Sequence, residues 1–319
     1  DILMAKAREG VKVRVIYDHV GSFHVASNFF QRMRNAGVEI YPFFRVAFPF
    51  FGSKINWRNH RKLVIIDGDI GYVGGMNIAD RYRDGGRKFP SWRDTHLRVS
   101  GAVVAALQYS FATDWAFIGK GLLTESAGSC SPRVRGIRCD AHLTTSGPTD
   151  QWCNIELLFL KAIGNAKKRI YIQTPYFLPT ESLLRAIQTA ALSRVDVRVM
   201  IPRHSDSAML TSASNSYISE CLAAGIKIYF YDAGMLHSKM VLVDDDFCSI
   251  GSTNFDFRSF EHNFESNLFI YTPEFNEKMR HLFHADMEKC EQIRLPRWRR
   301  RPLHRKALES IVRLLSPIL

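Results

Sequence analysis

The chain repeats itself, and this repeat limits the folds open to it more than any other feature of the sequence. The segment VKVRVIYD (residues 11–18) is echoed by VDVRVMIP (195–202), and AGVEIY (36–41) is echoed by AGIKIY (224–229). Each half of the chain has the order helix, alternating strand, helix and strand, which is typical of α/β units whose sheets are covered by helices. The sequence therefore predicts two similar α/β halves.

The repeat and the local composition suggest where these halves begin and end. We expect a first half over residues 1–118, a linker rich in Gly, Ser, Thr and Pro over 119–150, a second half over 151–290 and a basic amphipathic tail over 291–319. The second half contains KRIYIQTPYF ahead of its first echo, and the first half has no counterpart. We therefore expect the chain to be truncated at its N-terminus, so that its first sheet lacks an opening strand.

A matching pair of polar motifs lies within the repeat. Residues 59–77 read NHRKLVIIDGDIGYVGGMN, and residues 236–254 read LHSKMVLVDDDFCSIGSTN. In both copies a Lys follows the His by two positions, and an Asp, a Gly and an Asn follow at the same spacing. One copy could arise by chance, but two copies in matching places are a strong signal that they form one site. The motif residues are His60, Lys62, Asp67 and Asn77, then His237, Lys239, Asp244 and Asn254.

These residue types suit chemistry at a phosphodiester. On a strand, residues two apart share a face, so we expect each Lys to point the same way as its His, with the apolar runs LVII and MVLV as central strands. A neutral imidazole can attack phosphorus to give a phosphohistidine, while a protonated one donates to the leaving oxygen. Lysine and asparagine side chains would bind the phosphoryl oxygens. We expect no metal and no cofactor.

Each half also has a carboxylate that could orient a histidine. Asp94, in WRDTH, follows His60, and Glu265, in NFESN, follows His237, so we expect each to fix the tautomer of the imidazole in its own half. Glu261 competes with Glu265, and the sequence does not choose between them.

Other motif residues have plainer interpretations. Asp67 precedes a Gly in a good hairpin turn, and Asp244 opens the run DDD, so both could shape turns instead of contacting substrate. Asn77 and Asn254 could cap the helices that follow them.

Charge and composition indicate an anionic partner. Half of the net charge of +12 lies in residues 291–319, where apolar residues recur at helical spacing beside Arg and Lys. This tail could lie on an anionic membrane, pack on the domain or, less in keeping with its few aromatics, bind nucleic acid. The six cysteines show no metal or disulfide spacing, which indicates a reducing compartment. No stretch is apolar enough to span a membrane.

Both motifs match the signature of the phospholipase D superfamily, H-x-K-x4-D-x6-G-[GS]-x-N, which this chain resembles. The segments YIQTPYFLP, WRDTHLRVSG and LQYSFATDW are similar to those of bacterial cardiolipin synthases. The resemblance implies two α/β/α sandwich halves related by a pseudo-twofold axis, with one active site at their interface. It also implies transfer of a phosphatidyl group between two phosphatidylglycerol molecules, with His60 as nucleophile and His237 as acid and base.

Such synthases usually begin with membrane-spanning segments, so the resemblance implies a protein of the bacterial cell membrane, peripheral or on the cytoplasmic side in this chain. We expect phosphatidylglycerol and an anionic membrane surface as partners, with no nucleic acid and no obligate protein partner. A nuclease or phospholipid hydrolase of the same superfamily, and a lipid-binding fragment without activity, are the alternatives. The apolar segment VAFPFFG (46–52) favours lipid.

Overall fold

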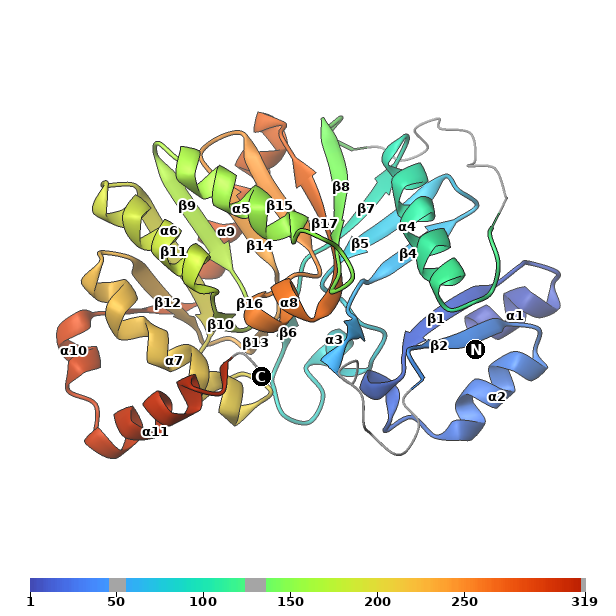
Figure 1. Ribbon diagram of the computed structural model, residues 1–319, viewed down its shortest axis with the longest axis horizontal. Coiled ribbons are helices and arrows are strands. Elements are labelled where there is room, and N and C mark those ends of the chain that lie inside the picture. Colours follow the sequence, from blue (N-terminus) through green and yellow to red (C-terminus); the bar gives the residue numbers. More distant parts are fainter. Residues whose placement is uncertain (46–55, 124–135, 317–319) are drawn as a thin grey trace.

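Two α/β halves lie side by side in the computed structural model, which describes residues 1–45, 56–123 and 136–316 (Figure 1). The apolar segment 46–52 and part of the predicted linker lie outside the described residues.

The first half contains short helices around two small sheets. Its elements are α1 (Ile2–Arg8), β1 (Arg14–Asp18), a 3₁₀ turn η1 (Val20–Ser22), α2 (Ser27–Asn35), β2 (Glu39–Phe43), β3 (Arg58–Asn59), β4 (Leu63–Ile66), β5 (Ile70–Gly74), α3 (Arg81–Asp84), β6 (Trp92–Arg93), β7 (His96–Ser100) and α4 (Val103–Phe117).

The second half is built on one large sheet with the strand order β18-β12-β11-β9-β14-β15-β17-β3, and β8 also pairs with β17. Its elements are β8 (Ala141–Ser146), α5 (Asn154–Asn165), β9 (Arg169–Gln173), β10 (Phe177–Leu178), α6 (Glu181–Leu192), β11 (Asp196–Pro202), α7 (Ala208–Ala223), β12 (Lys227–Tyr231), β13 (Met235–Leu236), β14 (Met240–Val243), β15 (Phe247–Gly251), β16 (Phe255–Asp256), α8 (Phe257–Glu261), β17 (Asn263–Ile270), α9 (Pro273–Met287), β18 (Cys290–Ile293), α10 (Leu295–Arg299) and α11 (Leu303–Arg313).

Strand pairing confirms the internal repeat. β1 and β2 run parallel with Arg14 opposite Glu39, and β11 and β12 run parallel with Arg198 opposite Lys227. The echoes VKVRVIYD/VDVRVMIP and AGVEIY/AGIKIY align these same positions. Because a slip of one residue would turn every side chain to the other face, equal register means that the two halves bury equivalent residues.

The first sheet is divided where the second is continuous. In the second half β9 lies between β11 and β14 and pairs with both. In the first half the equivalent strands β1 and β4 belong to separate sheets, and no strand among the described residues lies between them. Val64 and Ile66 of β4 are accordingly exposed, whereas Val241 and Val243 of β14 are buried. Among the described residues, the first half therefore has two separate sheets where the second half has one.

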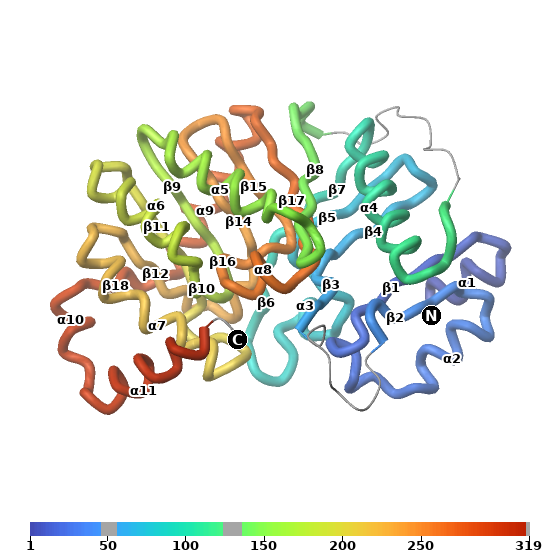
Figure 2. The backbone as a smooth tube through the Cα atoms, in the orientation of Figure 1, coloured from blue at the N-terminus to red at the C-terminus, as the bar shows by residue number. Residues whose placement is uncertain are grey.

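Helices α5, α6 and α7 cover one face of the large sheet, and α9 lies on the opposite face (Figures 1 and 2). An apolar cluster joins the two halves, because Val73 and Leu107 of the first half pack with Ile250 and Leu268 of the second. Burial of such side chains contributes about 1.5–3 kcal/mol each. The halves are therefore joined by a shared core.

Two of the predicted boundaries differ from the strands. β8 lies inside the predicted linker 119–150 and pairs along its length with β17, so the second sheet begins at Ala141. β18 likewise extends into the predicted tail and pairs antiparallel with β12. The composition of 119–150 is typical of a linker followed by a strand and a turn, and β8 is a strand in this segment.

Candidate active site

The two halves exchange short strands at their interface. β3, from the first half, runs parallel to the start of β17 in the second half, and the amide of His60 donates to the carbonyl of Phe264 at 2.9 Å. Reciprocally, β13 of the second half runs parallel to β6 of the first, and the amide of His237 donates to the carbonyl of Arg93 at 2.7 Å. Each His-x-Lys segment thus continues from a two-residue strand held by the opposite half.

This arrangement corrects the prediction that the histidines and lysines lie within regular strands. His60 and Lys62 lie between β3 and β4, and His237 and Lys239 lie between β13 and β14. The prediction failed because the apolar runs that define the strands begin only after each Lys.

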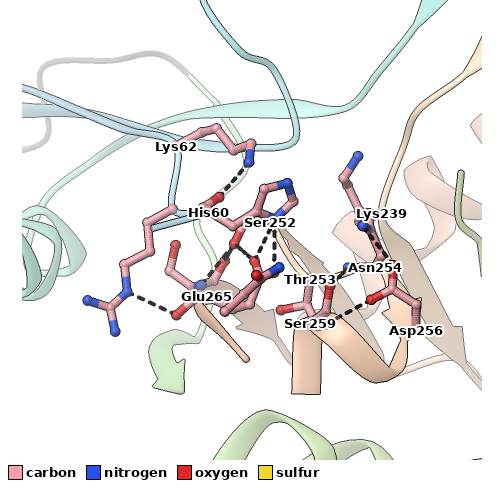
Figure 3. A network of polar contacts seen from close by, with 12 residues as sticks. His60, Lys62, Lys239, Ser252, Thr253, Asn254, Asp256, Ser259 and Glu265 are labelled. Atoms are coloured by element: carbon pink, nitrogen blue, oxygen red, sulfur yellow. Dashed lines mark hydrogen bonds and ion pairs between the residues drawn. The ribbon is translucent and has the colours of Figure 1, made fainter. Parts of the chain in front are cut away.

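His60 contacts the carboxylate of Glu265. Its Nδ1 lies 2.9 Å from Oε1 and 3.0 Å from Oε2 of that fully buried side chain (Figure 3). Ser252 Oγ and Asn263 Nδ2 also donate to Glu265. Despite the opposing effect of burial, His60, Lys62 and Ser252 hold the pKa of Glu265 at about 2. The carboxylate is therefore ionised and can orient the imidazole.

His237 contacts Asp94 in the same manner, with Nδ1 2.7 Å from Oδ2. The carboxylates predicted from sequence are therefore those beside the histidines, but the pairing within each half is wrong. Asp94 contacts His237 and Glu265 contacts His60, because the exchanged strands carry each histidine across to the other half. Glu261, the competing residue, lies exposed at the end of α8.

The paired carboxylates determine which ring nitrogen carries the proton. Ionised Glu265 only accepts hydrogen bonds, so Nδ1 of the neutral His60 ring is the donor and Nε2 keeps a lone pair. Burial raises the pKa of Asp94, and we assign the same tautomer to His237 from the equivalent contact of its Nδ1 with Asp94 Oδ2. Burial lowers the pKa of His60, and burial together with Lys239 and Lys62 lowers the pKa of His237 well below its usual value. Both rings are therefore neutral near pH 7, with a nucleophilic or basic Nε2.

The two lysines lie against the histidine backbones. Lys62 Nζ and Lys239 Nζ each donate at 2.6 Å to the carbonyl of the histidine two residues earlier. Lys239 Nζ also lies 2.7 Å from Nδ1 and 3.0 Å from Nε2 of His237. Burial lowers the pKa of Lys62 to about 7 and that of Lys239 to about 8. Each lysine also lowers the pKa of the histidine in the opposite half, so all four groups share one site.

The small residues of the motif make room for the carboxylates. A Cβ on Gly75 would lie 2.2 Å from Asp94 Oδ1, so only glycine fits there. At the equivalent position of the second half, Ser252 uses its hydroxyl to donate to Glu265. The sequence pattern G-[GS] therefore reflects two ways of accommodating a buried carboxylate.

Neither motif asparagine caps a helix. Asn77 Nδ2 donates to Tyr82 Oη at 2.5 Å, and the residue at the start of α3 is Asp80. Asn254 Nδ2 donates at 3.1 Å to Asp256, which itself caps α8 by accepting from Ser259. The capping interpretation is wrong for both, and the buried Asn254 lies near Lys239 in Figure 3.

The two motif aspartates lie at strand ends instead of at the histidines. The carboxylate of Asp244 accepts from the backbone amides of Lys167, Lys168 and Arg169 at 2.8–2.9 Å, which fixes the start of β9 beside the end of β14. Asp67 is exposed in the turn after β4, with φ of 54°. The turn interpretation therefore holds, and their assignment as catalytic residues is corrected.

Sequence reasoning missed the aromatic wall around His237. The rings of Tyr82 and Trp92 lie 5.4 and 5.3 Å from its imidazole, centroid to centroid. Burial raises the pKa of Tyr82 to about 12, so its phenol stays protonated. Trp92 lies two residues before Asp94 in WRDTH, and this closeness to a predicted site residue could have indicated its place in the site.

A second buried cluster holds the first histidine segment in place. Arg61 forms an ion pair with Asp114 of α4 and donates from Nε to the carbonyl of Glu265 at 3.1 Å. Asn59 Nδ2 donates to the other oxygen of Asp114 at 3.0 Å. Helix α4 therefore positions the backbone that carries His60.

Among the described side chains, no group of three or more His, Cys, Asp or Glu is arranged to hold a metal ion. The expectation that the site needs no metal or cofactor stays a prediction.

Comparison with known proteins agrees with this geometry. A family profile described as "Cardiolipin synthase, PLD-like domain" matches residues 1–86 and 159–287. The crystal structure of phosphatidylserine synthase from Haemophilus influenzae covers 99% of this chain and 85% of its own, with a TM-score of 0.70 at 14% identity, a likeness of fold. Fold and site together define a phospholipase D-like protein of two α/β halves.

Curated relatives narrow the class. Cardiolipin synthase 2 of Bacillus anthracis is 44% identical over 320 residues, and cardiolipin synthase of Halalkalibacterium halodurans is 44% identical over 322 residues. Both alignments cover 100% of this chain, which spans 62% and 64% of those proteins. The chain belongs to the family of phospholipase D-like cardiolipin synthase domains.

Proposed function

We propose that this site joins two phosphatidylglycerol molecules into cardiolipin and releases glycerol. One observation carries the proposal: two imidazoles, each oriented by a buried carboxylate of the opposite half, share a site with two buried lysines. This set supplies a nucleophile, an acid and base, and positive charge for a phosphodiester. The names of the relatives supply the choice of lipid.

In the first step, Nε2 of His60 attacks the phosphorus of one phosphatidylglycerol. The bond from phosphorus to the glycerol headgroup oxygen breaks, and Nε2–H of His237 gives its proton to that oxygen. Glycerol leaves, and the phosphatidyl group remains bonded to His60. In the second step, neutral His237 takes the proton of a hydroxyl on a second phosphatidylglycerol, whose oxygen displaces His60 and forms cardiolipin.

The first step needs a protonated His237, and the negative charge of the substrate favours this protonation. Burial, together with Lys239 and Lys62, lowers the pKa of His237 in the free site. A phosphodiester bound between the lysines offsets their charge, so the pKa of His237 rises when substrate arrives. We assign the side-chain amides of Asn77 and Asn254 as further donors to the phosphoryl oxygens.

Exposure supports the division of roles between the histidines. The side chain of His60 is 25% exposed and that of His237 is 7% exposed. An attacking nitrogen must reach phosphorus directly, whereas an acid and base needs only hydrogen-bond reach of the departing oxygen. His60 is therefore assigned as nucleophile and His237 as acid and base, with Glu265 and Asp94 as their positioning residues.

We also propose that the protein works at the bacterial membrane, where phosphatidylglycerol is found, and on its cytoplasmic side. None of the helices in the described ranges has both the length and the apolarity that a bilayer crossing requires.

The test compares the chain with His60→Ala and His237→Ala variants on phosphatidylglycerol vesicles, with lipid products followed by mass spectrometry. Replacement of the exposed His281 on α9 by alanine is the matched control. Cardiolipin and glycerol in equal amounts from the wild type and the control alone support the proposal. Phosphatidic acid as the sole product would make the protein a hydrolase, and cardiolipin from either site variant at the wild-type rate would contradict the assigned roles.

A further inference from the structure

Helix α11 packs on the protein through Val312 and several charged side chains. Arg313 pairs with Glu220 of α7 at 2.5 Å, and its guanidinium lies 4.1 Å from the ring centroid of Tyr217. On the same side Glu309 is buried and accepts from Arg301 at 2.6 Å. A helix on the surface of a domain normally turns most of its apolar side chains to the core, whereas α11 buries only Val312 and Glu309.

The apolar stripe of α11 consequently faces outward. Residues 303, 307, 311 and 314 recur at the three- and four-residue spacing that puts them on one face of a helix. Leu303 and Leu314 are each 80% exposed and Ile311 is 62% exposed. Figure 1 shows α10 and α11 as an arm along the lower edge of the molecule, beside α7. Exposed apolar side chains gathered along one helix indicate a binding surface.

Positive charge surrounds this stripe. Arg299, Arg300 and Arg305 are exposed, and no carboxylate in the described part of the chain pairs with them. A cavity of about 630 Å³ opens between α7, α10 and α11. Its charged walls comprise five arginines and only two glutamates: Arg203, Arg297, Arg300, Arg301, Arg305, Glu291 and Glu309. Arg203, Arg297 and Arg301 form ion pairs with Asp232, Glu291 and Glu309. The exposed Arg300 and Arg305 beside an apolar stripe match the two parts of an anionic phospholipid.

We propose that α10 and α11 form a docking arm for the surface of a bilayer that contains anionic phospholipid. The stripe of Leu303, Ala307, Ile311 and Leu314 inserts among the acyl chains, and the arginines bind headgroup phosphates. An amphipathic helix of this type lies in the interface and gains affinity both from apolar burial and from anionic lipid. The arm would hold the enzyme on the membrane that supplies its substrate, so its role in turnover rests on the proposed function.

The cavity beside the arm adjoins a second cavity that reaches the first half of the chain. A second cavity of about 420 Å³ shares His204, Thr211 and Ser212 with the first, and Lys88 lines it from the first half. Lys88 Nζ donates to the carbonyl of Asp206 at 2.7 Å. The space beside the arm therefore extends to Lys88 of the first half.

A membrane fits this surface better than a second copy of the chain. One face of an eleven-residue helix offers far less than the roughly 800 Å² per partner that stable protein interfaces bury. Two such arms would also bring unpaired arginines together, which is unfavourable. Nucleic acid would use the arginines but would leave the apolar stripe in water.

The test is sedimentation of the full chain with vesicles of phosphatidylcholine alone or with 30% phosphatidylglycerol. Leu303→Asn/Ile311→Asn removes the stripe, and Leu192→Asn, at a leucine 70% exposed on α6, is its control. Arg300→Gln/Arg305→Gln removes charge, and Arg8→Gln/Arg34→Gln is its matched control. We expect the stripe variant to lose at least about tenfold in affinity and the arginine variant about thirtyfold, with both controls unchanged.

Hydrogen exchange of the unaltered protein gives a second measurement that does not depend on the variants. Amides of residues 303–315 should gain protection when anionic vesicles are added. Unchanged binding by both variants, no gain in protection, or a concentration-dependent dimer that the stripe variant abolishes would overturn the proposal.

Failure of the arm and failure of the proposed function are distinguishable. Vesicle binding without lipid products would retain the docking arm and reject the synthase. Formation of cardiolipin from phosphatidylglycerol in detergent micelles, together with vesicle binding that does not depend on the stripe, would retain the synthase and reject the docking arm.

Discussion

Two short contacts join residues that are remote in the sequence. His60 and Glu265 are 205 positions apart, and His237 and Asp94 are 143 positions apart. Each contact sets a tautomer, and the tautomer leaves Nε2 available for phosphorus or for a proton. The chemistry assigned to the site depends on these two distances.

Glu265→Gln should lower kcat by about 10²- to 10⁴-fold with a much smaller change in KM. Glutamine keeps the shape of the side chain but can turn its amide toward Nδ1 of His60, and it removes the charge that favours the imidazolium. The measurement is steady-state formation of cardiolipin over a range of pH. Glu261→Gln, at the exposed end of α8, is the matched control and should behave as wild type. Equal losses from both substitutions would show that Glu265 has no special role.

Phosphodiester affinity should fall as the pH rises through the pKa values of the lysines, which are about 7 for Lys62 and about 8 for Lys239. Each ammonium binds a phosphoryl oxygen only when protonated, so the free site loses positive charge above these values. We expect a weakening of about tenfold or more between pH 6.5 and 9.5, measured by calorimetry with a short-chain phosphatidylglycerol and the His60→Ala variant.

Lys62→Met/Lys239→Met in the same background is the comparison for this titration. It should bind weakly at every pH and show a nearly flat profile. A wild-type-like slope in the absence of both lysines would assign the titration to another group.

At the scale of elements, the motif aspartate makes different contacts in the two halves. Asp244 joins β14 to β9 through three backbone amides, and these amides hold its pKa below the usual value against the opposing effect of partial burial. Asp67 has no β9 equivalent beside it among the described strands. The motif aspartate is therefore a strand connector where its neighbour strand is present.

Asp244→Ala should cost about 2 kcal/mol of unfolding free energy and leave kcat unchanged, because it leaves backbone donors without a charged acceptor. Its folded pKa lies below its unfolded value, so this stabilisation is present above about pH 4 and is lost as the pH falls further. Urea unfolding of the wild type and of Asp244→Ala at pH 7 and pH 3 measures this difference in unfolding free energy. Asp67→Ala, at the equivalent position, should change stability by less than about 0.5 kcal/mol. A large drop in kcat for Asp244→Ala in the folded protein would restore the catalytic interpretation.

Much of the architecture could be predicted because the two halves share the same pattern of apolar residues. The equivalent registers of β1/β2 and β11/β12, and the identity of both histidines and both lysines, follow from matching the two halves. The sequence did not distinguish Glu265 from Glu261. The partner of each histidine could not be predicted, because it depends on β3 and β13. These strands have two residues each, which is too short for any periodic signal.

At the scale of the whole molecule, the exchange of strands makes the site a property of both halves. Neither half contains a complete pair of histidine and carboxylate, and the shared core around Val73 and Ile250 fixes their relative position. Duplication of one α/β unit can explain why the motif occurs twice, and the exchange explains why two copies make one site. Helix α11 follows the last strand of the second half.

The crossed pairing is tested most directly by ring ¹⁵N chemical shifts of the histidines in the wild type, in Glu265→Gln and in Asp94→Asn. These shifts report which ring nitrogen carries the proton. The crossed arrangement predicts that Glu265→Gln changes the spectrum of His60 and leaves the tautomer of His237 intact, and that Asp94→Asn does the converse. If Glu265→Gln instead altered His237, and Asp94→Asn altered His60, each half would hold its own pair and the composite site would be contradicted.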